Sequence, residues 1–257
     1  MEEFKNKTVI ITGAASGIGY ATADVFLKEG ANVVIADIDK DAGILASQQL
    51  SNKYRECLFI ETDIGDESSI KSMVEQTIEK FGNVSVLVNC AACFIMKGIE
   101  ATPEDWVKIC SINIAGYALC AKHCLPYMIK ENKGVIVNVC SISAFIAQPN
   151  FVTYSATKGA VASMTRCMAL DLAKYNIRVN AISPGTVWTK SNEDFHKRVL
   201  QMDKTDADRH PNIGGSHILG RTAYPEEIAE SILFLSSDKS SFTTASNLIV
   251  DGGCISI

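Results

Sequence analysis

Tyr154 and Lys158 lie four residues apart in the stretch Tyr-Ser-Ala-Thr-Lys, and this spacing places both side chains on one face of a helix. An ammonium beside a phenol stabilises the phenolate, so it lowers the phenol pKa from about 10 toward the range of proton transfer near neutrality. The pair therefore predicts a general acid/base at Tyr154. Because the pattern is also common on solvated helices, its meaning depends on the rest of the chain.

A glycine-rich turn near the N-terminus predicts a nucleotide site. The stretch 12–19 reads Thr-Gly-Ala-Ala-Ser-Gly-Ile-Gly and lies between a short apolar run and a segment with helical spacing. Glycines at such a turn permit a sharp bend, a close approach of the backbone to a pyrophosphate and close helix packing. The first turn of the helix then offers N–H groups to the phosphates.

Asp37 ends the next apolar run, Val-Val-Ile-Ala-Asp, and selects between the two nicotinamide cofactors. A carboxylate at this position accepts hydrogen bonds from both adenosine-ribose hydroxyls and repels a 2′-phosphate. No Arg or Lys occurs at Ala14, Ala15 or Ile38 to offset that repulsion. The sequence therefore predicts NAD rather than NADP, with a solvated loop Asp as the alternative.

Composition narrows the class of protein. The 257 residues carry a net charge of −5 with acidic and basic side chains interspersed, so no basic patch for a nucleic acid is expected. No apolar run approaches the roughly eighteen residues of a membrane span, and the segment 1–8 lacks the form of a signal peptide. Nine cysteines without an export signal indicate reduced thiols. We expect a cytoplasmic protein that acts on small molecules.

Apolar runs alternate with helix-like segments along the whole chain, which predicts a single α/β domain over 1–257. Several runs are apolar throughout, as expected for a parallel sheet covered on both faces. The pattern predicts a Rossmann-like doubly wound fold, a seven-stranded parallel sheet with helices on both faces. The expected strands are Thr8–Thr12, Asn32–Asp37, Cys57–Glu61, Val84–Asn89, Val135–Cys140, Arg178–Ser183 and Leu248–Val250, and expected helices include Ile18–Glu29, Ile70–Lys80, Pro103–Lys130, Tyr154–Lys174 and Pro225–Leu235.

One long connection interrupts this alternation. Between Thr189 and Arg221 the sequence is polar and rich in turn formers. Because connections this long in compact domains are usually functional or mobile, we expect a substrate lid at 190–220, with a disordered surface loop as the alternative. His196, His210 and His217 fall in this segment and are interpreted as polar loop residues. The alternative is that one of them contacts the substrate.

Taken together, these motifs resemble the short-chain dehydrogenase/reductase family, and the resemblance covers essentially the entire chain. It is carried by the glycine-rich turn, Asn113 in the fourth helix, Ser141 thirteen residues before Tyr154, Lys158, and Pro184-Gly185 after the sixth strand. The resemblance implies that Tyr154 exchanges a proton with the substrate oxygen, while Lys158 lowers its pKa and holds the nicotinamide ribose. It also implies that Ser141 donates a hydrogen bond to that oxygen and that Asn113 anchors a water in a proton relay.

Two serines compete for the oxyanion role in Cys-Ser-Ile-Ser at 140–143. The spacing to Tyr154 favours Ser141, and Ser143 is interpreted as lining the substrate pocket or capping the turn.

The resemblance further implies a set of NAD contacts. Thr189 carries a hydroxyl that would orient the nicotinamide carboxamide, with a helix cap as the alternative. After the fourth strand the family's Asn-Asn-Ala-Gly is replaced by Asn89-Cys90-Ala91-Ala92, so we expect an altered cofactor cradle with activity retained. The implied contacts are Gly13, Ser16, Gly17, Ile18, Gly19, Asp37, Asp63, Ile64, Asn89, Tyr154, Lys158, Pro184, Gly185, Val187 and Thr189.

The substrate is predicted only as a small alcohol or ketone, a secondary alcohol interconverted with its ketone by hydride transfer. Gln148, Asn150 and Trp188 favour a sugar or polyol, whereas Phe145, Ile146, Phe151 and Met96 equally suit a steroid or lipid alcohol. A nucleotide-sensing protein without turnover is a further alternative. The predicted substrate contacts are Ser141, Ser143, Gln148, Tyr154 and Trp188.

Two further expectations concern metal and assembly. Cys90 and Cys93 form a C-x-x-C, but with His123-Cys124 they match no standard zinc spacing, so we expect no metal and treat a metal or redox site as the alternative. The family resemblance implies a homotetramer. The segments 114–124 and 160–172 carry more apolar and small residues than one core-facing stripe needs, and a helix buried on two sides is the competing explanation.

Overall fold

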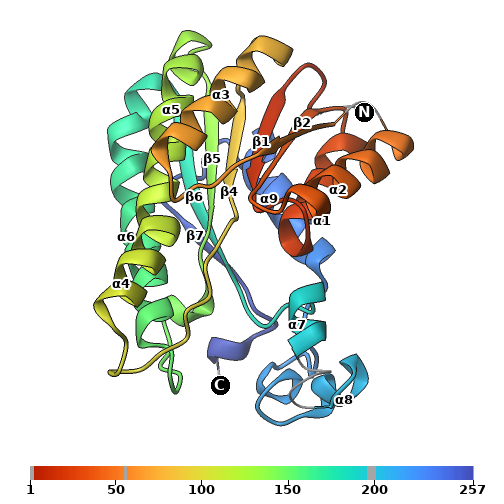
Figure 1. Ribbon diagram of the computed structural model, residues 1–257, viewed down its shortest axis with the longest axis vertical. Coiled ribbons are helices and arrows are strands. Elements are labelled where there is room, and N and C mark those ends of the chain that lie inside the picture. Colours follow the sequence, from red (N-terminus) through yellow and green to blue (C-terminus); the bar gives the residue numbers. More distant parts are fainter. Residues whose placement is uncertain (1–2, 55–56, 196–200, 257) are drawn as a thin grey trace.

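The computed structural model describes residues 3–54, 57–195 and 201–256, and its centre is one parallel seven-stranded sheet (Figure 1). The strand order β3-β2-β1-β4-β5-β6-β7 confirms the predicted doubly wound α/β fold. Each predicted strand overlaps its observed counterpart, and the largest shift is at β4, which begins at Val86 rather than at Val84. The strands are β1 (Thr8–Thr12), β2 (Asn32–Asp37), β3 (Leu58–Glu61), β4 (Val86–Asn89), β5 (Gly134–Val139), β6 (Ile177–Pro184) and β7 (Asn247–Val250).

Helices cover both faces of this sheet. Figure 1 shows α3, α4, α5 and α6 on one face and α1, α2 and α9 on the other. The α-helices are α1 (Gly17–Lys28), α2 (Lys40–Lys53), α3 (Glu67–Phe81), α4 (Pro103–Cys110), α5 (Tyr117–Lys130), α6 (Val152–Leu172), α7 (Lys190–Phe195), α8 (Lys204–Arg209) and α9 (Pro225–Ser236). The short 3-10 and π segments are η1 (Ser111–Gly116), η2 (Ile142–Ala144), η3 (Ala173–Tyr175), η5 (Gly214–Ser216), η6 (Asp238–Ser240) and η7 (Cys254–Ser256).

The two faces of the sheet bury separate apolar cores. In β1, Val9 and Ile11 pack into the core shared with α1 and α9, while Ile10 between them packs into the core shared with α3, α5 and α6. This alternation is the two-residue period of a strand. Because both sets face a core, β1, β4 and β5 are buried throughout and mostly apolar, which explains the runs without polar alternation in the sequence.

Two helical segments differ from the sequence expectation. The predicted helix Pro103–Lys130 is a continuous helical run, but its centre, η1, is π-helical. At Gly116 this run approaches the loop after β3 so closely that a Cβ would lie 2.6 Å from the carbonyl oxygen of Ile64. Helix α2 was not among the predicted helices because few of its side chains are buried, and its start is fixed by the Asp39 carboxylate, which accepts from the Ala42 amide at 3.0 Å.

The strand order places β1 beside β4, and the connections from these two strands run to opposite faces. In such sheets ligands bind in the crevice beyond the carboxyl ends of these strands. The segment after β6, with α7 and α8, also lies beyond the carboxyl ends of the strands (Figure 1). The expected lid at 190–220 is therefore in a suitable place, and its residues 196–200, including His196, lie outside the described part of the chain. Within that part, no helix has the length and apolar character needed to cross a membrane.

Candidate active site

Ser141, Tyr154 and Lys158 come together at the carboxyl end of β5. Ser141 follows this strand, and Tyr154 and Lys158 lie one turn apart near the start of α6. The Ser141 side chain is near enough to that of Tyr154 to act on its pKa, and the Nζ of Lys158 donates to the carbonyl oxygen of Val139 at 2.8 Å. Since the exposed fractions of Tyr154 and Lys158 are 7% and 1%, both polar groups are removed from bulk solvent.

A row of polar side chains continues from Ser141 away from Tyr154. The Oγ of Ser141 accepts from the Ser143 amide and donates to the Ser143 hydroxyl, each at 3.1 Å. Ser143 in turn donates to the Oε1 of Gln148 at 2.6 Å. Ser141 is therefore the residue that caps η2, and the buried Ser143 links it to Gln148.

Burial acts against charge on both members of the Tyr-Lys pair. It raises the pKa of Tyr154 well above its ordinary value, although the neighbouring Ser141 side chain partly opposes this shift. It lowers the pKa of Lys158 to about 8. In the protein alone the Tyr154 pKa thus moves opposite to the direction predicted from the spacing, because the phenol is buried. The Lys158 ammonium donates to Val139 and lies 5.6 Å from the centre of the Tyr154 ring.

Asn113 is fully buried in η1, and its side chain is saturated by the chain itself. Its Oδ1 accepts from the Cys93 amide at 2.7 Å, and its Nδ2 donates to the Cys93 carbonyl oxygen at 3.0 Å and to the Thr157 hydroxyl at 3.2 Å. The predicted role as anchor of a relay water is untested. The side chain holds the loop after β4 against α6.

The glycine-rich turn has the shape of a cradle for a pyrophosphate. Gly13 and Gly17 adopt φ of 67° and 56°, and a Cβ at Gly13 would lie 2.6 Å from the Cα of Ala91. Gly19 packs so closely that its Cβ would lie 2.2 Å from the Gly13 carbonyl oxygen. Ser16 begins α1 without a side-chain cap, and the first turn, which includes Ile18, carries no acidic residue. These residues fit a dinucleotide, because the helix start can receive an anion.

Asp37 lies beside this turn, as predicted. Its Oδ2 accepts from the Ala15 amide at 2.9 Å and its Oδ1 from the Asp39 amide at 3.0 Å. The two hydrogen bonds hold the carboxylate at the carboxyl end of β2, where an adenosine ribose would lie next to a pyrophosphate on α1.

Three predicted adenine and ribose contacts differ in accessibility. Asp63 is exposed and accepts from the Gly65 amide at 2.8 Å, whereas the Ile64 side chain is buried. Asn89 is fully buried, its Nδ2 donates to Asn138 at 2.9 Å, and its Oδ1 has no hydrogen-bond partner among the described residues. A ribose contact at Asn89 stays a prediction, and since the side chain is enclosed, such a contact would use the main chain.

The predicted nicotinamide end lies after β6. Pro184 is buried, and Gly185 is required because a Cβ there would lie 2.9 Å from the Asp251 Cα. Val187 is buried, and the Trp188 amide donates to the Ala223 carbonyl oxygen at 2.8 Å. The Thr189 hydroxyl accepts from the Asn192 amide at 3.3 Å, which is the helix-cap alternative. A Cβ at Gly17 would meet the Thr189 methyl at 3.2 Å, so this end closes over the glycine-rich turn.

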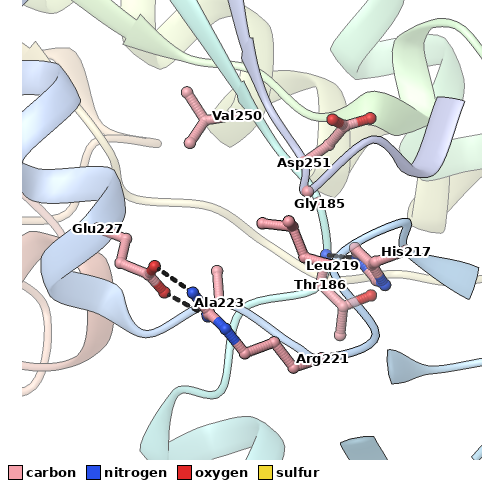
Figure 2. A pocket seen from close by; sticks show the side chains of 10 residues that line it. Gly185, Thr186, His217, Leu219, Arg221, Ala223, Glu227, Val250 and Asp251 are labelled. Carbon is pink, nitrogen blue, oxygen red and sulfur yellow. Dashed lines mark hydrogen bonds and ion pairs between the residues drawn. The ribbon is translucent and has the colours of Figure 1, made fainter. Parts of the chain in front are cut away.

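Figure 2 shows a cavity of about 80 Å³ behind Gly185, lined in part by His217, Arg221 and Glu227. Its volume is well below the roughly 300 Å³ of small-molecule sites, so it is a gap between the segment after β6 and the sheet. His217 is buried here, and its Nε2 accepts from the Thr186 amide at 3.2 Å while its Nδ1 lies 2.8 Å from the Ile213 carbonyl oxygen. A neutral ring with its proton on Nδ1 satisfies both contacts.

Several residues around the site were missed by the sequence reasoning. Tyr117 is fully buried in α5, and its hydroxyl donates to the same Val139 carbonyl oxygen as Lys158, at 3.3 Å. The Thr12 hydroxyl accepts from the amides of Cys90 and Ala91 at 3.0 and 3.1 Å, which ties β1 to the loop after β4. A Thr at the end of the first strand is a local signal for such a hydrogen bond. No residue near Tyr117 in the sequence indicates that its hydroxyl binds the Val139 carbonyl oxygen.

The cysteines of the C-x-x-C do not form a disulfide, since all nine cysteines are free. Burial raises the pKa of the Cys90 thiol to about 12, and it also raises the pKa of Cys93. Neutral thiols are poor metal ligands and poor nucleophiles. Within the described residues no group of three or more His, Cys, Asp and Glu side chains has the arrangement of a metal site.

A dinucleotide cradle beside a buried Ser-Tyr-Lys cluster defines an oxidoreductase site. The family model described as enoyl-(acyl carrier protein) reductase matches residues 13–254, and the chain belongs to the short-chain dehydrogenase/reductase family.

The relatives are similar over nearly their whole length. An uncharacterized oxidoreductase of Thermotoga maritima is 39% identical, covering 97% of this chain and 96% of its own. Cis-4-hydroxycyclohexanecarboxylate dehydrogenase of Sinomonas cyclohexanicum is 37% identical, covering 98% of both chains. The crystal structure of levodione reductase has a TM-score of 0.87 at 28% identity, covering 97% of this chain and 98% of that one. The family resemblance predicted from the sequence is thereby confirmed.

Proposed function

We propose that this protein is an NAD-dependent oxidoreductase that interconverts a secondary alcohol and a ketone by hydride transfer. The observation that carries the proposal is that Ser141, at the carboxyl end of β5, acts on the buried phenol of Tyr154, with the buried Lys158 one turn further along α6. Because the phenol of Tyr154 and the hydroxyl of Ser141 are close together, both can hydrogen-bond the same substrate oxygen. The relative that acts on a hydroxycyclohexanecarboxylate supports this reaction class.

In the oxidation direction, bound NAD supplies the acceptor for the hydride that leaves the carbinol carbon. Tyr154 takes the proton from the alcohol oxygen, and Ser141 donates a hydrogen bond to that oxygen as the carbonyl forms. Lys158 places positive charge near the Tyr154 ring and favours the phenolate. In the reduction direction Tyr154 returns the proton to the oxygen. Asn113 holds the loop after β4 beside these groups, in addition to any part in proton relay.

The residues around the glycine-rich turn would hold the cofactor. Asp37 would accept the adenosine-ribose hydroxyls and exclude a 2′-phosphate, which favours NAD over NADP. The pyrophosphate would lie on the start of α1. The other proposed contacts are Gly13, Ser16, Gly17, Ile18 and Gly19 at the turn, Asp63, Ile64 and Asn89 toward the adenine half, and Pro184, Gly185, Val187 and Thr189 toward the nicotinamide.

Two substrate classes fit this chemistry, a sugar or polyol and an apolar alcohol. Ser143, Gln148 and Trp188 are the proposed polar or aromatic contacts of the first class. The name of one relative, a hydroxycyclohexanecarboxylate dehydrogenase, favours a ring compound that carries a hydroxyl. A panel of both classes therefore belongs in the first experiment.

The experiment follows NADH absorbance with NAD and a panel of sugars, polyols, hydroxy acids, cycloalkanols and hydroxysteroids. Tyr154→Phe removes only the acid/base hydroxyl, so turnover should fall by about 1,000-fold. Tyr175→Phe, a partly buried tyrosine of η3 near the amino end of β6, is the matched control and should keep wild-type activity. Cofactor binding without turnover of any substrate would favour a nucleotide-sensing protein instead. Activity that survives Tyr154→Phe would reject Tyr154 as the acid/base.

We further propose a homotetramer in the cytoplasm. The α5 and α6 surfaces support an assembly, because they form a groove that includes Ala118, Leu125 and Met168, and Leu170 nearby is largely exposed. Sedimentation velocity at micromolar concentration should give a tetramer, and a monomer would contradict the assembly.

A further inference from the structure

The ring of Phe94 covers one face of the Tyr154 ring. The two rings stack with centroids 5.2 Å apart and an interplanar angle of 21°. Phe151 meets the same tyrosine edge-on, with centroids 6.1 Å apart. Tyr154 is buried by these contacts, but Phe94 is 63% exposed. A large aromatic side chain in contact with the acid/base therefore offers most of its own surface to an incoming molecule.

The loop that carries Phe94 is fixed on both sides of this residue. Before it, Asn113 binds the amide and the carbonyl oxygen of Cys93. After it, the Thr153 hydroxyl donates to the Ile95 carbonyl oxygen and accepts from the Lys97 amide. Asn113 and Thr153 are fully buried. Since Thr153 directly precedes Tyr154 in α6, the position of Phe94 is set by the same helix that sets the acid/base.

Apolar side chains continue from Phe94 along the two loops that flank Tyr154. Met96 in the loop after β4 is 47% exposed, and Phe145 in the loop after β5 is 51% exposed. Figure 1 shows these two loops at the same end of the sheet, beyond β4 and β5. Thr153 of α6, the helix that follows the second loop, accepts a hydrogen bond from the Lys97 amide of the first. Exposed apolar residues gathered beside a reactive group mark a binding surface for apolar groups.

Two polar groups of these loops are already paired within the protein. The Lys97 ammonium lies 2.7 Å from the Asp105 carboxylate, and the Gln148 carboxamide oxygen accepts from Ser143. A polyol placed against Phe94 would lose water from its hydroxyls without regaining hydrogen bonds there. An apolar ring or alkyl chain would instead remove both its own surface and that of Phe94 from water.

We infer that Phe94 is a specificity-determining residue that selects alcohols whose carbinol carbon carries an apolar ring or alkyl group, in preference to polyols. This inference rests on the proposed alcohol oxidation and names its substrate class. Phe94 acts on the carbon skeleton beside the reacting carbon, while Tyr154 and Ser141 act on the oxygen.

Steady-state kinetics at saturating NAD test the inference with cyclopentanol and cyclohexanol against sorbitol and xylitol. The wild type should prefer the cycloalkanols. Phe94→Ala should raise KM for cyclohexanol about ten-fold or more with a smaller change in kcat, and should leave kcat/KM for the polyols nearly unchanged. Phe94→Leu should recover part of the loss. The control Phe242→Ala removes a phenylalanine that is 103% exposed and should change none of these constants.

A wild-type preference for polyols, or an unchanged KM for cyclohexanol in Phe94→Ala, would overturn the inference. An equal loss of kcat for every substrate would also overturn it, because Phe94 would then serve only to place Tyr154. The pH profile of kcat/KM should therefore be the same in Phe94→Ala and the wild type.

A binding measurement keeps the inference separate from the proposed reaction. Cyclohexanol and NADH form a dead-end pair that cannot react, so NADH fluorescence reports binding alone. Phe94→Ala should weaken cyclohexanol binding to the enzyme–NADH complex by about the same factor as it raises KM. If no alcohol is oxidised, the proposed function fails, and unchanged cyclohexanol binding in Phe94→Ala would overturn the inference about Phe94.

Discussion

Asn113 binds Cys93 with both ends of its carboxamide. The Cys93 amide donates to Oδ1 at 2.7 Å, and Nδ2 donates to the Cys93 carbonyl oxygen at 3.0 Å. The same Nδ2 reaches the Thr157 hydroxyl in α6 at 3.2 Å. The π-helical η1, the loop after β4 and the helix of the acid/base therefore meet at one buried side chain.

Asn113→Asp should destabilise the protein and reduce turnover. The carboxylate keeps an acceptor for the Cys93 amide but loses both donors, and its second oxygen faces a carbonyl in a buried place. We expect the free energy of unfolding to fall by about 2 kcal/mol or more. Urea unfolding measures this, with Asn52→Asp on the exposed face of α2 as the control. Equal stability of the Asn113→Asp variant and the wild type would refute the positioning role.

Lys158→Met should stabilise the cofactor-free protein at neutral pH. Burial lowers the pKa of Lys158 to about 8 from its ordinary 10.5. Below pH 8 the folded and unfolded chains both hold the proton, so the folded chain bears the full cost of a buried ammonium. Between pH 8 and 10.5 the unfolded chain binds more protons, so this contribution to the free energy of unfolding rises with pH, and above 10.5 the cost is gone.

The gain from Lys158→Met is therefore about 3 kcal/mol below pH 8 and shrinks toward pH 10.5. Urea unfolding between pH 6 and 10.5 measures the difference, and the exposed Lys130→Met corrects for the remaining titrating groups. A difference that does not change with pH would mean that the Lys158 pKa is not lowered. The variant should lose turnover, because the positive charge beside Tyr154 is lost.

Asp37 should make NAD the preferred cofactor by on the order of 100-fold in kcat/KM, because a carboxylate beside a 2′-phosphate costs several kcal/mol. The double substitution Asp37→Ala with Ile38→Arg should reverse the preference, since it removes the repulsion and adds a cation. Ile38→Arg alone should improve NADP only weakly. Fluorescence titrations with NADH and NADPH check this, and tighter binding of NADPH by the wild type would exclude the assignment.

The two serines after β5 should differ in effect. Ser141→Ala removes the hydroxyl that meets Tyr154, so kcat should fall about 100- to 1,000-fold. Ser143→Ala removes only the group between Ser141 and Gln148, and a loss of about ten-fold or less is expected, with a similar loss for Gln148→Ala. Kinetics with one cycloalkanol compare the three variants. A larger loss in Ser143→Ala than in Ser141→Ala would exchange their roles.

The strands and the glycine-rich turn were predictable because their signals are local. Buried strands show apolar runs, and the positive φ at Gly13 and Gly17 requires glycine within a few residues of β1. The order of Ser141, Tyr154 and Lys158 along the chain was also readable, because helix and strand spacing place them.

The contacts that join distant segments were not predictable from the sequence. Asn113 and Cys93 are separated by 20 positions, and no feature of either residue names the other. The direction of the Tyr154 pKa shift was likewise hidden, since it depends on burial of the phenol, to which the rings of Phe94 and Phe151 are adjacent. Spacing can place two side chains on one helix face, but their solvation depends on the folded surroundings.

The loop after β4 is held in place by hydrogen bonds to its main chain. Asn113 and Thr153 hydrogen-bond main-chain atoms of Cys93, Ile95 and Lys97, and the side chain of Phe94 takes no part in these bonds. Replacement of that side chain leaves these hydrogen bonds intact. Substitutions at position 94 should therefore change substrate preference with little loss in the free energy of unfolding. Directed evolution of this chain should therefore begin with saturation of position 94.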